Sequence, residues 1–150
     1  MPSLLRALSN HPIHKDFGLL LIRVGIGTIT LVFHGYGKIT GGPELWAGIG
    51  GAMGNLGIGG APALWGFMAA FAEFACSILI ILGVMFRPAT AMLAFTMFVA
   101  MLHHVNMPVD HPMAGWEGAA HAMEMLVVYA GLMLAGPGRY AFRLIPSNKQ

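Results

Sequence analysis

Residues 64–104 of the chain read LWGFMAAFAEFACSILIILGVMFRPATAMLAFTMFVAMLHH. Two apolar runs fill this stretch, and only the turn Phe86-Arg87-Pro88 separates them. An α-helix needs about 20 mostly apolar residues to cross the roughly 30 Å hydrocarbon core of a bilayer, and each run approaches that length. The stretch therefore predicts a hairpin of two membrane-spanning helices.

Apolar runs of similar length lie on both sides of this hairpin. The four spans are predicted at about residues 17–34, 64–85, 88–104 and 118–136. The connection between the first two spans, GGPELWAGIGGAMGNLGIGGAP, is rich in glycine yet apolar, and Pro43 suits the first turn of a helix. We expect a short helix there at the outer membrane surface, with a flexible glycine linker as the alternative. Its apolar residues would face the membrane or the bundle: Leu45, Trp46, Ile49 and Met53.

The composition supports a membrane environment for the whole chain. Hydrophobic residues make up 57% and charged residues 9% of the 150 residues, whereas soluble domains carry about 25% charged residues. The net charge of +2 provides no basic surface for nucleic acid. The single cysteine, Cys76, excludes an internal disulfide framework. We predict one all-α membrane domain over residues 1–150, a four-helix bundle with the lipid bilayer as its solvent.

The orientation follows from the lysine and arginine residues. Four spans place both termini and the turn at Arg87 on one side, and only Lys38 lies in a loop on the other side. The first side carries Arg6, Lys15, Arg87, Arg139, Arg143 and Lys149. Cytoplasmic loops carry an excess of lysine and arginine. The sequence therefore predicts an integral protein of a bacterial-type cytoplasmic membrane with both termini in the cytoplasm.

Ionisable residues inside the spans indicate function, because each costs several kcal/mol unless it is paired or hydrated. Arg23 lies in the first span, Glu73 in the second and Glu124 in the fourth. Counting along the helices places Arg23 and Glu73 at similar depth. A pair between them that only holds the bundle together is one interpretation. A polar lining that binds a ligand or relays protons is the other.

The outer ends of the third and fourth spans carry candidate metal ligands in a methionine-rich region. Glu117, His121 and Glu124 share one helix face at i, i+4 and i+7. Thioether with imidazole suits copper(I), imidazole with carboxylate suits zinc or iron, and paired histidines suit a haem. The metal hypothesis rests on His103, His104, Glu117 and His121. The alternative is that the methionines fill the core and the histidines are hydrated at the interface.

Several segments, in order, resemble a known family. Residues 19–42, LLLIRVGIGTITLVFHGYGKITGG, place an arginine inside the first span and a His-Gly pair ahead of a lysine. Residues 70–89, AFAEFACSILIILGVMFRPA, place a glutamate in the second span. His103 ends the third span, and Glu124 is followed by AGPGRY at the end of the fourth. Over about residues 17–140 the chain resembles the DoxX family of small membrane proteins.

This resemblance implies a four-helix membrane protein. The family takes its name from a subunit of a thiosulfate:quinone oxidoreductase, and relatives are associated with quinone and thiol redox chemistry. The resemblance therefore implies a role near the quinone pool, with a redox partner protein. The recurrent polar positions of the family fall on Arg23, His34, Lys38, Glu73, His103 and Glu124. The histidines at 104, 111 and 121 and Glu117 match no such position, which keeps the metal hypothesis open.

Three functions follow as hypotheses. The first is an oxidoreductase subunit that binds a quinone-type or other small ligand in a polar cavity of the bundle. Ligand binding or proton relay would then fall to Arg23, His34, Lys38, Glu73 and Glu124. The second is the binding or handling of copper, zinc, iron or haem at the outer face. The third is a non-catalytic scaffold for another membrane complex. Glycines in the first and fourth spans suit close packing, either against another chain in a homo-oligomer or within the bundle itself.

Overall fold

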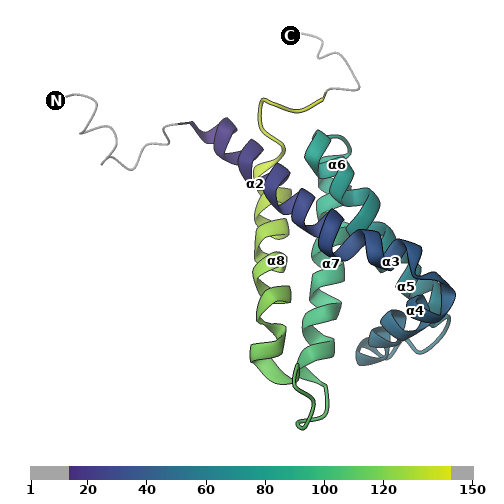
Figure 1. Cartoon of the computed structure of the whole chain (residues 1–150). Coiled ribbons are helices and arrows are strands. Elements are labelled where there is room, and N and C mark those ends of the chain that lie inside the picture. Colours follow the sequence, from purple (N-terminus) through teal and green to yellow (C-terminus); the bar gives the residue numbers. More distant parts are fainter. Residues whose placement is uncertain (1–13, 143–150) are drawn as a thin grey trace.

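The computed structural model describes residues 14–142, and within them it contains helices and no strand. Four helices are long and apolar enough to cross a membrane: Lys15–Thr40, Pro62–Leu82, Phe86–Val105 and Gly115–Ala135. Figure 1 shows them as one bundle with a shorter helix, α4, at the side. The predicted all-α, four-span architecture is confirmed, and the protein is an integral membrane protein.

Two of the four spans are interrupted by π-helical turns. The first span consists of α2 (Lys15–Thr30), the turn η1 (Leu31–Gly35) and α3 (Tyr36–Thr40). The second consists of α5 (Pro62–Phe71), the turn η3 (Ala72–Cys76) and α6 (Ser77–Leu82). The third span is α7 (Phe86–Val105) and the fourth is α8 (Gly115–Ala135). The first span ends at Thr40 and not near residue 34, because the helix continues through glycine and polar residues that hydropathy alone leaves out.

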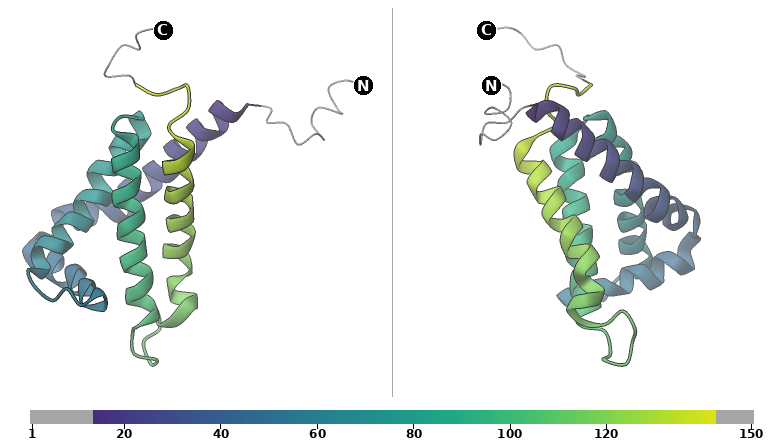
Figure 2. Two further views of the ribbon diagram at one scale, coloured as in Figure 1. Left: turned by 180° about the vertical axis from the view of Figure 1, so that it is seen from behind. Right: turned by 60° about the vertical axis from the view of Figure 1, so that its left-hand side comes forward.

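The core of the bundle forms where α6, α7 and α8 pack together. α7 and α8 lie side by side and antiparallel in both figures of the whole chain (Figures 1 and 2). Their contact closes over a cluster of fully buried apolar side chains that includes Ile80, Leu93, Tyr129 and Leu132. Apolar side chains on the outer faces remain exposed, as expected for helices surrounded by lipid.

Both ends of the described chain lie at the same end of the bundle as the turn before α7 (Figure 1). The backbone N–H of Arg139 donates to Asp16 Oδ1 at 3.0 Å. The backbone N–H of Phe142 donates to the carbonyl oxygen of Leu82 at 3.0 Å. The segment after α8 therefore crosses the ends of α2 and α6. We call this the Arg87 end of the bundle and the opposite end, with the loop after α7, the His103 end.

The predicted short helix between the first two spans is present as α4 (Gly42–Gly50), followed by the 3-10 turn η2 (Gly51–Leu56). α4 packs against α5 at a backbone contact that only glycine permits. A Cβ on Gly50 would collide with the Pro62 carbonyl oxygen, and a Cβ on Gly66 would collide with the Trp46 carbonyl oxygen. The Trp46 indole also donates to the Lys38 carbonyl oxygen at 2.7 Å. This packing excludes the flexible-linker alternative.

Candidate functional site

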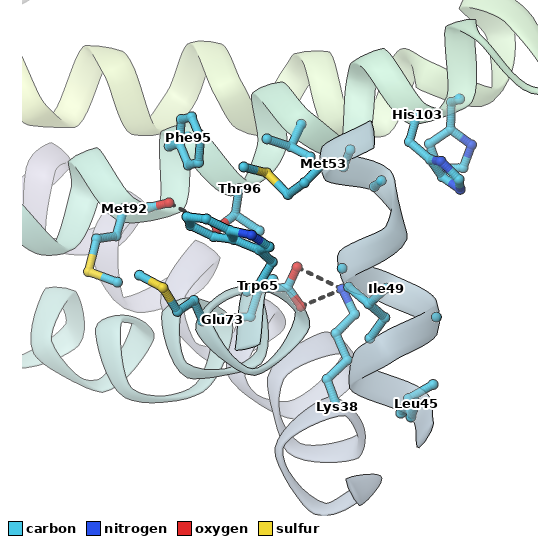
Figure 3. Close-up of a pocket in the computed structure, with 18 of the residues that line it drawn as sticks. Lys38, Leu45, Ile49, Met53, Trp65, Glu73, Met92, Phe95, Thr96 and His103 are labelled. Carbon is cyan, nitrogen blue, oxygen red and sulfur yellow. Dashed lines mark hydrogen bonds and ion pairs between the residues drawn. The ribbon is translucent and has the colours of Figure 1, made fainter. Parts of the chain in front are cut away.

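A cavity of about 730 Å³ lies between α5 and α7 and is closed at the His103 end by α4 and η2. This volume falls within the roughly 300–1,000 Å³ of small-molecule sites. Figure 3 shows that aromatic, aliphatic and thioether side chains form most of its wall. They include Leu45, Ile49, Met53, Trp65, Met68, Met92 and Phe95. Such a lining suits a lipid-soluble ligand.

One buried ion pair interrupts this apolar wall. Lys38 Nζ donates to Glu73 Oε1 at 2.7 Å and lies 2.6 Å from Oε2 (Figure 3). The Glu73 side chain is 3% exposed and the Lys38 side chain 31%. Both carboxylate oxygens of Glu73 therefore lie next to the Lys38 ammonium. A ligand at this position would meet an ammonium donor and a carboxylate acceptor together.

The two π-helical turns bring this pair together. A π-turn inserts an extra residue into a helix, and such turns are frequent at functional sites. Here η1 crosses η3 with Gly35 pressed against the backbone of Glu73 and Phe74, where a Cβ would have no room. Lys38 follows Gly35 by about one helical turn and so reaches the carboxylate of Glu73. The crossing therefore fixes both the depth and the partner of Glu73.

The cavity extends to both sides of this pair along α7, toward Met92 on one side and His103 on the other (Figure 3). The Cys76 thiol, about one turn from Glu73, lies 3.9 Å from the Met92 sulfur. His103 follows Met92 on α7 and also lines the cavity, so the cavity runs about 16 Å along the helix axis. At the His103 end of the cavity, the polar lining side chains are Glu44, His103 and His104.

Arg23 lies outside this site. Its side chain is buried, at 2% exposure, and a Cβ on Gly83 would collide with its guanidinium. Glu73 is ten residues before Gly83, which corresponds to about 15 Å along a helix. The expectation that Arg23 and Glu73 share a depth was wrong, and Glu73 pairs with Lys38. The reason is the first span, which is 26 residues long and strongly tilted (Figure 1).

A second polar contact joins the first span to α8. The rings of His34 and His121 stack with centroids 5.3 Å apart and planes at 23°. One turn away, the hydroxyl groups of Thr30 and Tyr129 are hydrogen-bonded at 2.5 Å. Glu124, in contrast, is exposed on α8 and does not line the cavity. The structure thus separates the polar positions of the sequence into a cavity pair, a histidine stack and isolated residues.

The four candidate metal ligands lie in two places. His103 and His104 line the cavity from α7, with ring centroids 5.9 Å apart. Glu117 and His121 are exposed on α8. Within residues 14–142, no three histidine, cysteine, aspartate or glutamate side chains are arranged to hold a metal ion. The metal site stays a prediction from the sequence.

The hydrogen bond between Thr30 and Tyr129 gives a test of the contact between the first span and α8. Tyr129→Phe leaves the buried Thr30 hydroxyl without its partner. We expect a loss of about 1 kcal/mol in the free energy of unfolding. Tyr36→Phe is the matched control, because Tyr36 is 63% exposed. The measurement is unfolding by denaturing detergent in mixed micelles. Equal stability of the two variants would argue that this bond contributes nothing.

Sequence reasoning did not anticipate two of the polar or amphipathic residues at this cavity. Glu44, in the first turn of α4, and Trp65, on α5, both line it. The signal for Glu44 was a lone carboxylate beside the apolar face of the predicted helix. The three aliphatic residues expected on that face, Leu45, Ile49 and Met53, all line the cavity. Trp46 packs against Phe67 instead, with ring centroids 5.0 Å apart.

Comparison with known proteins yields one match. No curated protein and no solved structure matches the chain. The profile of the family described as DoxX matches residues 18–105. This region runs from α2 to the end of α7 and holds every residue that lines the cavity. It stops before α8, so it does not include His121 and Glu124. Because the match covers more than half of the chain, the chain belongs to the DoxX family.

Proposed function

We propose that this protein binds a quinone-type, lipid-soluble ligand in the cavity between α5 and α7, as part of redox chemistry near the quinone pool. The observation that carries the proposal is the Lys38–Glu73 pair on a mostly apolar wall. A quinone has an apolar ring and tail and two carbonyl oxygens. Its carbonyl accepts a hydrogen bond from an ammonium, and the hydroxyl of the reduced form donates one to a carboxylate.

Burying Lys38 and Glu73 inside the membrane costs free energy, and this cost supports a functional role for the pair. Ionisable groups inside a membrane are expensive, and they mark ligand or proton sites. A buried ion pair is at best a weak stabiliser compared with well-packed apolar residues. The family resemblance also implies that Lys38 and Glu73 are polar positions of the family. A ligand that uses both groups would account for their presence in this wall.

The chemistry assigned to the chain's own residues is limited to binding and proton transfer. Reduction of a bound quinone takes two electrons and two protons. A redox partner protein would supply the electrons, which makes this chain a subunit or accessory of an oxidoreductase. In this proposal Glu73 exchanges one of the two protons with a ligand oxygen, and the Lys38 ammonium exchanges the other. We place the Arg87 end of the bundle in the cytoplasm, following the charge distribution of the loops.

Fluorescence quenching tests the proposal directly. Trp65 lines the cavity, and a bound quinone quenches a neighbouring indole. We expect saturable quenching when a short-tailed benzoquinone is titrated into the purified protein in nanodiscs, and we expect Trp65→Phe to remove most of it. Glu73→Gln should weaken binding by about tenfold or more, because a hydrogen bond to a charged group is worth roughly 1.5–3 kcal/mol.

Glu124→Gln provides the matched control. It removes a carboxylate from another membrane-spanning helix, but Glu124 is exposed and lies outside the cavity. Its dissociation constant should equal that of the unmodified protein. Equal weakening by both variants would refute binding at this cavity. A protein that shows no quenching would favour the scaffold hypothesis, and metal analysis of the same preparation tests the metal hypothesis.

A further inference from the structure

The two walls of the cavity separate from each other toward the His103 end. α6 and η3 pack against α7, but α5 makes almost no contact with it among the described residues. The left view of Figure 2 shows the same divergence of the second span from α7. η2 packs against α7, and α4 packs against α5, so these elements close the His103 end. On the face seen in the left view of Figure 2, no helix of residues 14–142 lies across the space between α5 and α7, whereas the first span crosses behind it.

The side chains at this gap line the cavity and are also exposed on the surface of the bundle. Met68 on α5 is 41% exposed and Phe95 on α7 is 50% exposed, and both also line the cavity. Ala91, one turn from Phe95, is exposed and lines it too. Phe95 is the tenth residue of the 20-residue helix α7, so the gap lies at mid-membrane depth. An opening here meets acyl chains and not water.

The polar route into the cavity is less suitable for an apolar tail. At the His103 end the lining includes the exposed or half-buried polar side chains of Glu44, His103 and His104. Drawing an alkyl chain past them would remove their hydration without offering hydrogen bonds in return. At the α5–α7 gap no such cost arises, because the lining there is apolar.

We propose that the cavity opens sideways into the bilayer between Met68 and Phe95, and that the hydrocarbon tail of the ligand occupies this opening while its head lies at Lys38 and Glu73. The inference rests on the proposed function and adds to it the ligand class, an amphiphile with a long apolar tail, and its route of entry. Ala91, Met68 and Phe95 then determine specificity for the tail.

The test compares two benzoquinones that share a head group, one without a tail and one with an isoprenoid tail. Both are titrated by Trp65 quenching in nanodiscs. Ala91→Phe adds bulk in the gap, away from Lys38 and Glu73. We expect it to weaken binding of the tailed probe by at least about tenfold, which is the scale on which a hydrophobic site discriminates between ligands. The tail-less probe should bind unchanged, which also shows that the variant is folded. Met68→Phe serves as a second variant should Ala91→Phe fail to fold.

Gly51→Phe is the matched control at the His103 end. Gly51 is exposed on η2 and does not line the cavity, and nothing lies within 4 Å of a Cβ built there. It should leave both probes unaffected. Tailed-probe binding that falls with Gly51→Phe, or that survives the two gap variants, would overturn the sideways opening while the proposed function stands. Failure of both probes to bind the unmodified protein would remove the proposed function and this inference together.

Discussion

Lys38→Met is expected to lower the free energy of unfolding by about 3–5 kcal/mol, because it leaves the buried Glu73 carboxylate without a counter-charge. The Glu73 side chain is 3% exposed, and Lys38 is the only cation within ion-pair distance of it among residues 14–142. Removing one partner of a buried pair costs more than the pair itself contributes. Unfolding by denaturing detergent in mixed micelles measures the effect.

The double variant Lys38→Met/Glu73→Met separates the two contributions. With both charges gone, neither group is buried without a partner, and stability should return to the unmodified value or exceed it. Glu124→Met is the control for loss of a carboxylate alone, because Glu124 is exposed, and it should change stability by no more than about 0.5 kcal/mol. A double variant as unstable as Lys38→Met would mean that the loss does not come from an unpaired Glu73 carboxylate.

The spans and the short helix could be predicted because they depend on local sequence. The length of an apolar run sets whether a helix can cross the bilayer, and the hairpin around Arg87 needs no knowledge of the rest of the chain. The helix at residues 42–50 followed from Pro43 at its start and from a row of aliphatic residues. These elements are all present in the structure, but some bounds differ. The first span ends at Thr40, the second ends at Leu82, and the fourth begins at Gly115. The turn of the hairpin lies at residues 83–85, because Phe86, Arg87 and Pro88 form the first turn of α7.

The partner of Glu73 could not be predicted from residue counts. Counting along a straight helix placed Glu73 level with Arg23, but the tilt of α2 carries Arg23 toward Gly83. The tilt and the two π-helical turns arise from packing between helices, which hydropathy does not report. Family resemblance did mark Lys38 and Glu73 as polar positions, but not as a pair. The cavity was equally hidden, because its walls come from three separate segments.

Gly66→Ala and Gly50→Ala are each expected to destabilise the protein by about 2–3 kcal/mol, near the upper end of overpacking effects. A Cβ at either position would collide with a backbone carbonyl of the facing helix, which no change of side-chain rotamer relieves. α4 must then move away from α5. Since α4 closes the cavity, binding of the quinone probe should weaken together with stability. Detergent unfolding and Trp65 quenching measure the two effects.

Gly48→Ala should act in the opposite direction. Gly48 lies on the same helix, but a Cβ there meets nothing within 4 Å. In a helix interior, alanine is favoured over glycine by roughly 0.8–1.0 kcal/mol, so this variant should be neutral or more stable. The sign of the change in stability separates two explanations of the glycine-rich segment. If all three glycines are there for flexibility, all three variants stabilise the helix. If Gly50 and Gly66 are there for close backbone contact, only Gly48→Ala stabilises the helix. The position of α4 over the cavity then depends on the absence of a Cβ at Gly50 and Gly66.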